Sequence, residues 1–184
     1  MTGNKLRLYL GYWRRQESDV HPGKYHVSLL LTAKKPRNDL PTAKRYHAVN
    51  PIDCETKTEI WKFEILQTEA RTTKLAGVML LGKVPPDVTM EGIEEILKKV
   101  HVPTPEEAQK INWHCRHWVL EALEGLMVGG VILTPPSSPQ EMWNTGRSFV
   151  EDKTARVDGY PVQSKWLYTC DMSGKEISSE IRPL

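Results

Sequence analysis

One cysteine lies at the start of a predicted helix, where the helix would favour its reactive thiolate form. Cys115 comes near the start of a segment with helical periodicity, residues 112–127, whose plausible N-cap is Asn112. At about the third helical position, unpaired backbone N–H groups and the positive end of the helix dipole favour a thiolate. The same periodicity puts Cys115 on the buried face, so a small apolar residue filling the first turn is the alternative role. Cys54 and Cys170 have no such helix start, and we interpret both as incidental.

A nucleophilic cysteine needs a base within hydrogen-bond reach, and the base needs a partner that orients it. Two histidines, His26 and His47, each follow a tyrosine on a segment with strand character. If these strands are neighbours, their imidazoles lie side by side and form a Cys115–His26–His47 group with the helix start. The other four histidines lie in loops or beside the cysteine on its own helix, where adjacent positions do not share a face: His21, His101, His114 and His117.

The elements that must position these residues follow from hydrophobic periodicity. Five strands connected by short turns are predicted, which indicates a meandering antiparallel sheet: 5–13, 25–32, 43–50, 59–67 and 75–84. Helices follow at 89–100, 112–127 and 139–152, with a short turn that Thr104 begins. Residues 166–170 indicate an edge strand, and residues 173–184 a mobile tail. The predicted fold class is therefore α+β, with about five antiparallel strands and helices packed on one face.

The composition indicates one globular domain. The chain has 184 residues, 39% hydrophobic and 26% charged, enough for one core. We predict a single domain over residues 1–184, with a core at 5–152 and a partly mobile extension at 153–184. No apolar run reaches the length of a membrane span, and the N-terminus lacks the pattern of a secretory signal. Three widely spaced cysteines fit a reducing compartment, so we expect a cytoplasmic protein.

The charge balance gives a weaker indication. A net charge of +2 does not by itself predict a nucleic-acid partner. Basic residues nevertheless cluster in the first quarter of the chain, where they either cap solvated strand ends or form a phosphate-binding face: Arg14, Arg15, Lys34, Lys35, Lys44 and Arg45. Both interpretations stay open from the sequence.

The segment CRHWV that begins at Cys115 resembles the N-C-E-H-F-V box of the lecithin:retinol acyltransferase-like proteins. These are permuted papain-like, NlpC-type thiol enzymes, in which a strand histidine, a second histidine on the next strand and a helix-start cysteine follow in that order. The resemblance covers roughly residues 25–126. The desumoylating isopeptidases share this order, and the box is also similar to W-N-C-x-x-W-V in uncharacterised fungal proteins. Here the cysteine follows the first histidine by 115 − 26 = 89 residues, and His114 replaces the asparagine of the box.

The resemblance implies acyl transfer on an amide or ester. His26 would take the Cys115 proton or pair with its thiolate, and His47 would orient His26 and favour its charged imidazolium. The thiolate would attack a carbonyl to give a thioester, and water, an amine or an alcohol would then accept the acyl group. The Cys115 N–H would meet the oxyanion together with a second donor. The tyrosine candidates for that donor, and the tryptophans expected to wall the pocket, are Tyr9, Tyr12, Tyr25, Trp13, Trp113 and Trp118.

Other functions stay open from the sequence. The same thiol could form peptide bonds from aminoacyl-tRNA, in the manner of a cyclodipeptide synthase, with the basic clusters holding phosphates. The fold could also be a non-catalytic papain-like binding module. Cys115, His26 and His47 have ligand types suited to zinc but lack an obvious fourth ligand. The favoured interpretation predicts no cofactor and no metal, with a small molecule, a peptide or an acyl compound as substrate, and leaves the oligomeric state open.

Overall fold

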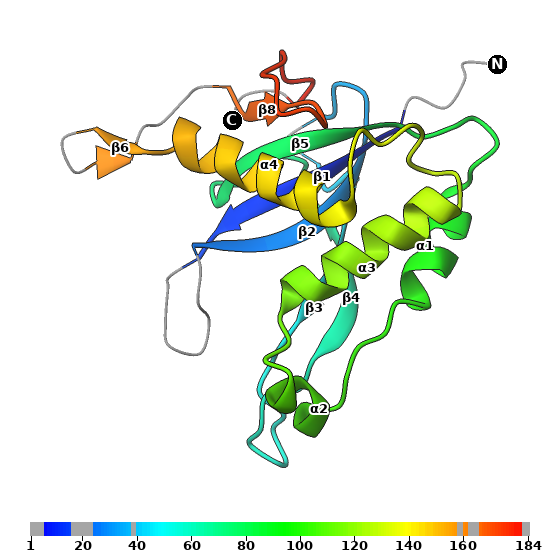
Figure 1. Ribbon diagram of the computed structural model, residues 1–184, viewed down its shortest axis with the longest axis vertical. Coiled ribbons are helices and arrows are strands. Elements are labelled where there is room, and N and C mark those ends of the chain that lie inside the picture. Colours follow the sequence, from blue (N-terminus) through cyan, green and yellow to red (C-terminus); the bar gives the residue numbers. More distant parts are fainter. Residues whose placement is uncertain (1–5, 16–23, 38–39, 158–159, 162–165, 182–184) are drawn as a thin grey trace.

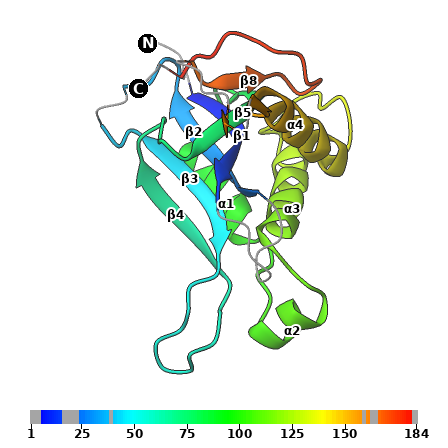
Figure 2. The same cartoon turned by 90° about the vertical axis from the view of Figure 1, so that its left-hand side faces the viewer.

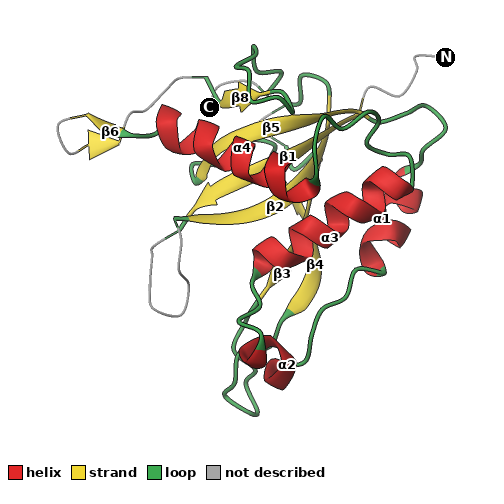
Figure 3. Ribbon diagram, viewed as in Figure 1, coloured by secondary structure: helices red, strands yellow, loops and turns green. Residues whose placement is uncertain are grey.

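The computed structural model is a mixed α+β structure (Figures 1 and 3). It describes residues 6–15, 24–37, 40–157, 160–161 and 166–181. Three parts of the predictions lie outside the described residues: Lys5 at the start of the first strand, the loop histidine His21, and the last three residues of the predicted tail.

The sheet has six strands in the order β4-β3-β2-β1-β5-β8. All neighbouring strands are antiparallel except β5 and β8, which run parallel. Five of the six are the predicted strands with small shifts in their ends, and β8 is the predicted edge strand. Their bounds are β1 Leu6–Arg14, β2 Tyr25–Ala33, β3 Ala43–Val49, β4 Lys62–Thr68, β5 Leu75–Lys83 and β8 Tyr168–Cys170. A separate two-stranded ladder pairs β6 Arg156–Val157 with β7 Tyr160–Pro161.

The predicted meander holds for the first four strands and is wrong for the fifth. β5 does not continue beside β4 but returns to pair with β1, so β1 and β5 lie inside the sheet. The reason is burial: Met79 and Leu81 pack in the core on the helix side, while Leu75 and Val78 pack on the other side. A strand that is apolar on both faces is stable only where both faces are covered. β4 is only partly buried and forms the edge.

Four helices follow at the predicted places: α1 Met90–Lys98, α2 Pro105–Lys110, α3 Cys115–Val128 and α4 Pro139–Lys153. Thr89, Thr104 and Ser138 cap α1, α2 and α4 by accepting a backbone N–H. The predicted start of α3 is wrong by three residues. Asn112 has a left-handed φ of 50°, and His114 is the N-cap. Cys115 is therefore the first helical residue.

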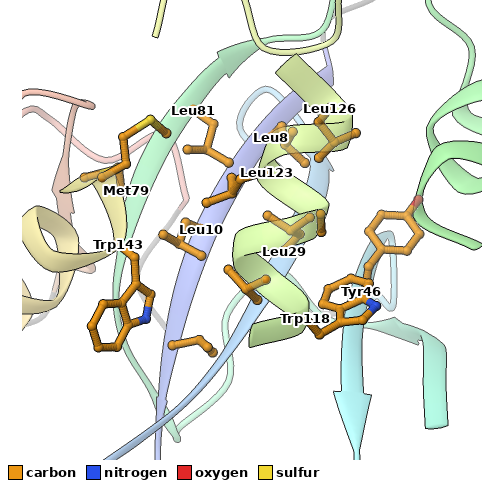
Figure 4. Packing of buried hydrophobic residues seen from close by; sticks show 14 of the residues in the cluster. Leu8, Leu10, Leu29, Tyr46, Met79, Leu81, Trp118, Leu123, Leu126 and Trp143 are labelled. Atoms are coloured by element: carbon orange, nitrogen blue, oxygen red, sulfur yellow. The ribbon is translucent and has the colours of Figure 1, made fainter. Parts of the chain in front are cut away.

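The helices cover one face of the sheet, as predicted. Residues of α1, α3 and α4 share the main core with one face of the strands, and α3 and α4 lie along that face (Figure 2). Leu123 and Leu126 of α3 point toward Leu8 of β1, and Trp118 lies beside Tyr46 (Figure 4). Within the described residues, no helix has both the length and the apolar character that a bilayer crossing requires.

The C-terminal segment covers part of the opposite face, where a mobile tail was expected. Ile181 is fully buried in the second cluster with Tyr9 and Leu30. Arg7 Nε donates to Glu180 Oε2 at 2.8 Å, and Lys34 Nζ lies 3.6 Å from the same carboxylate. The second apolar face of β1 and β2 gives this segment a surface to pack on, which the segment's own weak periodicity does not reveal.

Candidate active site

Cys115 lies where α3 meets the side of β2. Its side chain is 3% exposed, and burial raises the pKa of its thiol. Smaller influences oppose burial and favour the thiolate: the backbone N–H groups of Val27 and Arg116, and the positive charges of Arg15 and Arg45. Because backbone N–H groups of a strand lie in the plane of the sheet, a sulfur that interacts with Val27 N–H lies at the side of β2. Val27 directly follows His26.

His26 and His47 lie together, as the sequence predicted. Nε2 of His26 is 2.9 Å from Nδ1 of His47, and the two rings meet edge to face with centres 5.1 Å apart. His47 is 4% exposed. Burial, with a smaller contribution from the Arg45 charge, lowers the pKa of His47 to about 3. His47 is therefore neutral at neutral pH.

A carboxylate lies next to the ring nitrogen of His47 that does not contact His26. Nε2 of His47 lies 3.2 Å from Oε2 of Glu64 on β4, although the geometry is not that of a regular hydrogen bond. A proton on His47 Nε2 faces this carboxylate and leaves Nδ1 as an acceptor. In that tautomer His26 donates through Nε2–H, and its Nδ1 has the lone pair that can accept a proton. Glu64 was not among the site residues predicted from the sequence, because it occupies an ordinary polar position of an amphipathic strand.

The cysteine and the histidines approach β2 from different layers. Leu29 packs with the helices and Leu30 packs in the opposite cluster, so the alternation of side chains puts His26 on the face away from α3. The β2–β3 ladder pairs only residues 29–31 with 44–46. Beyond these pairs, the end of β2 that carries His26 and Val27 has no partner in that ladder. Cys115 thus adjoins β2 at the end where its pairing with β3 stops.

A cavity of about 100 Å³ lies beside Cys115. Its aromatic wall comprises Tyr12 and Tyr25, which were predicted to bind substrate, together with Trp143 of α4. Both tyrosine hydroxyls already have partners: Tyr12 donates to the Trp143 carbonyl at 3.0 Å, and Tyr25 lies 2.9 Å from the Thr154 hydroxyl. Four cationic side chains complete the polar wall: Arg15, Lys24, Arg116 and Arg147.

Trp143 lines this cavity but was not predicted from the sequence as a site residue. The guanidinium carbons of Arg116 and Arg147 lie 5.2 and 5.4 Å from its ring centre, a cation–π arrangement. α4 approaches β1 closely here because residue 146 is glycine, and a Cβ at that position would collide with the Tyr12 hydroxyl. Position 143 follows the helical period of α4, but the period alone does not show which helix reaches the cysteine.

The other predicted aromatic residues lie elsewhere. Trp118 is fully buried and stacks on Phe63 at 5.2 Å, on the β3 side of α3 and away from Trp143 (Figure 4). Trp113 packs on Trp61 at 4.9 Å and lines a different hollow, beside α2. Tyr9 and Trp13 belong to the cluster on the face opposite the helices. None of these four lines the Cys115 cavity.

The structure does not gather the predicted basic residues on one surface. Lys44 is paired with Glu94 at 2.6 Å, and Arg45 is half-buried, with its guanidinium 4.0 Å from the centre of the Trp13 ring. Arg14 is the last residue of β1 and pairs with Tyr25, the first residue of β2. Lys34 and Lys35 come after the last residue of β2, at the opposite end of that strand. Arg15 alone of the six lines the cavity.

The zinc alternative finds no support in the described part of the chain. No group of three histidine, cysteine or acidic side chains there is arranged to hold a metal ion.

Comparison with known proteins places the chain in a family without assigning an activity. Neither the curated proteins nor the solved structures contain a match. A family model, described as a family of unknown function, matches residues 5–172, which is most of the chain. The chain therefore belongs to this family, DUF6914.

Proposed function

We propose that the protein is a cysteine-dependent acyl-transfer enzyme of permuted papain-like design, with Cys115 as nucleophile, His26 as base and His47 as the residue that orients the base. The observation that carries the proposal is the 2.9 Å contact between His26 and His47. His26 directly precedes Val27, whose backbone N–H interacts with the Cys115 sulfur. A nucleophile, a base and an orienting partner are the three parts that thiol acyl transfer requires.

The reaction begins with proton transfer from the thiol to Nδ1 of His26. Because burial raises the pKa of Cys115, we infer a resting thiol that loses its proton as it attacks, not a preformed ion pair with His26. Sγ bonds to the carbonyl carbon, and the carbonyl electrons move to oxygen. The Cys115 N–H at the start of α3 and the cationic Arg116 side chain on the cavity wall favour that oxyanion.

Collapse of the tetrahedral intermediate breaks the bond to the leaving amine or alcohol, which takes the proton from His26. The acyl group is then a thioester on Cys115. His26 removes a proton from the acceptor, the acceptor oxygen or nitrogen bonds to the acyl carbon, and the C–S bond breaks to return the thiol. Water as acceptor makes the enzyme a hydrolase, and an amine or alcohol makes it a transferase. The neutral His47 accepts the His26 Nε2–H throughout.

The cytoplasm suits this chemistry. The three cysteines are unpaired, and Cys54 is exposed, so a reducing compartment keeps both this thiol and the nucleophile free. The aminoacyl-tRNA alternative has less support, because the basic residues expected to hold phosphates are dispersed. The non-catalytic binding module remains the competing function, and the following experiment separates it from the enzyme.

The test uses p-nitrophenyl acetate and intact-protein mass spectrometry. We expect one acetyl group, mapped to Cys115 by peptide analysis and absent in Cys115→Ala. In His26→Gln the rate of acetylation should fall by about 10²–10⁴-fold, the usual contribution of a general base. Two matched controls should behave as wild type: Cys54→Ala, which removes an exposed thiol, and His101→Gln, which removes an exposed imidazole. Equal, slow acetylation of all three thiols would favour the binding module.

A further inference from the structure

We propose that the cavity beside Cys115 binds an anionic group of the substrate, a carboxylate or a phosphate. That the anion belongs to a substrate rests on the proposed function, whereas the anion site itself rests on the composition of the cavity wall. Its charged members are Arg15, Lys24, Arg116 and Arg147, and none of the described residues that line it is acidic. Glu151 lies 2.8 Å from Arg147, one turn along α4, and balances part of this charge.

Four cations around about 100 Å³ repel one another, and a bound anion relieves that repulsion. Cys115 does not supply the anion in the resting protein, because burial raises its pKa. The described part of the cavity wall therefore carries positive charge directly beside the sulfur. Lys24 and Arg147 are exposed and are thus accessible to a ligand that enters from solvent.

Two residues that line the cavity each have a buried donor without a hydrogen-bond partner among the described residues. One is Nε of Arg116, and the other is the indole N–H of Trp143, whose side chain is 8% exposed. Buried polar groups in folded proteins nearly always have a partner. An oxyanion accepts from guanidinium and indole N–H groups alike and forms the stronger, charge-assisted kind of hydrogen bond. The two donors and the four cationic side chains thus indicate the same ligand chemistry.

The volume restricts where the anion lies in the substrate. A cavity of about 100 Å³ accommodates a small group and not an extended chain. Cys115 is itself part of the wall, so the bound anion lies close to the carbon that the sulfur attacks. The expected substrate therefore carries its carboxylate or phosphate near the reacting carbonyl, and any larger part extends into solvent.

The test compares two alkylating reagents that differ in charge, iodoacetate and iodoacetamide. In each, Sγ bonds to the methylene carbon, iodide leaves and the thiol proton goes to a base, so no turnover is needed. Peptide mapping gives the iodoacetate-to-iodoacetamide rate ratio at each cysteine, with the exposed Cys54 as internal reference. We expect the ratio at Cys115 to exceed that at Cys54 by about tenfold or more, and to fall as salt is added.

Variants identify the cations that cause the preference. Lys24→Gln and Arg147→Gln should each lower the ratio at Cys115, and both side chains are exposed, so the fold is expected to survive. Lys83→Gln is the matched control, because it removes an exposed lysine from the end of the β1–β5 ladder away from Arg14 and Arg15. It should leave the ratio unchanged.

Protection experiments distinguish the two anions. Sodium acetate and sodium phosphate at matched ionic strength are tested for slowing the alkylation of Cys115 by iodoacetamide, and the better protector identifies the preferred group. The proposal is overturned by equal ratios at Cys115 and Cys54, by the absence of protection by either anion, or by failure of both reagents to reach Cys115. The acetylation of Cys115 by the neutral p-nitrophenyl acetate is a separate measurement, so the proposed function can stand if the anion site fails.

Discussion

Nε2 of His26 lies 2.9 Å from Nδ1 of His47, and the two residues come from strands that are neighbours in the sheet. Glu64 on the next strand lies 3.2 Å from the far nitrogen of His47. A line of three polar side chains thus crosses β2, β3 and β4 and ends at the strand segment that meets Cys115. This arrangement engages Nε2 of His26, so Nδ1 is the nitrogen that we propose as the base.

The buried neutral His47 makes folding sensitive to acid. Its pKa is about 3 in the folded protein against 6.5 for an ordinary histidine, so between these values the unfolded chain binds a proton that the folded chain does not. The free energy of unfolding should therefore fall on acidification from about pH 6.5 to pH 3, by up to about 1.4 kcal/mol per pH unit from this group.

Urea denaturation at a series of pH values measures that slope. His47→Gln should be less stable than wild type at pH 7, because it disrupts the contact with His26, but should lose less stability per pH unit on acidification. His101→Gln is the control, since its imidazole is exposed, and it should retain the wild-type slope. An unchanged slope in His47→Gln would show that another group causes the acid sensitivity.

Replacing Glu64 should alter the pH dependence of acetylation. In Glu64→Gln the negative charge that favours the His26 imidazolium through His47 is lost, so the acid limb of the rate profile should move to lower pH. The maximal rate should fall by less than in His26→Gln, because Glu64 acts through His47. Rates of Cys115 acetylation from pH 5 to 9 provide the measurement, with the exposed Glu95→Gln as control. A lower rate with an unmoved profile would indicate a structural role for Glu64.

Trp118 should prove a core residue and not a wall of the site. It is fully buried and stacks on Phe63, so Trp118→Ala should lower the free energy of unfolding by about 3–5 kcal/mol. The exposed Trp166→Ala should cost much less in the same urea titration. Wherever the Trp118 variant is folded, its iodoacetate-to-iodoacetamide ratio at Cys115 should equal that of wild type. A changed ratio in a Trp118→Ala protein of wild-type stability would instead indicate that Trp118 forms part of the binding site.

The C-terminal segment should contribute to stability. Ile181→Ala removes most of a fully buried side chain and should lower the free energy of unfolding by about 2–5 kcal/mol. Glu180→Gln weakens the 2.8 Å pair with Arg7 and should cost roughly 1 kcal/mol or less, because such partly exposed pairs contribute little. Wild-type stability in Ile181→Ala would support the mobile tail that the sequence indicated.

Local pattern predicted most of the elements. Alternation located the strands, and capping residues such as Thr104 and Ser138 located helix starts. The start of α3 was misplaced because Asn112 is a strong N-cap type, yet its backbone is left-handed there, and His114 precedes the helix instead. His114 N–H donates to His117 Nδ1 at 2.9 Å, so a histidine satisfies the helix start in place of the usual hydroxyl or carboxylate.

The sequence by itself determined which residues have suitable chemistry: one cysteine at a helix start and two histidines on successive strands. Only the tertiary structure decided what surrounds them. Trp143 and Arg147 come from α4, far from Cys115 in the chain, and Glu64 reaches His47 across a strand pairing. Periodicity records which face of an element is buried, because burial acts residue by residue. It does not record which element that face meets, because that depends on how all the faces pack together.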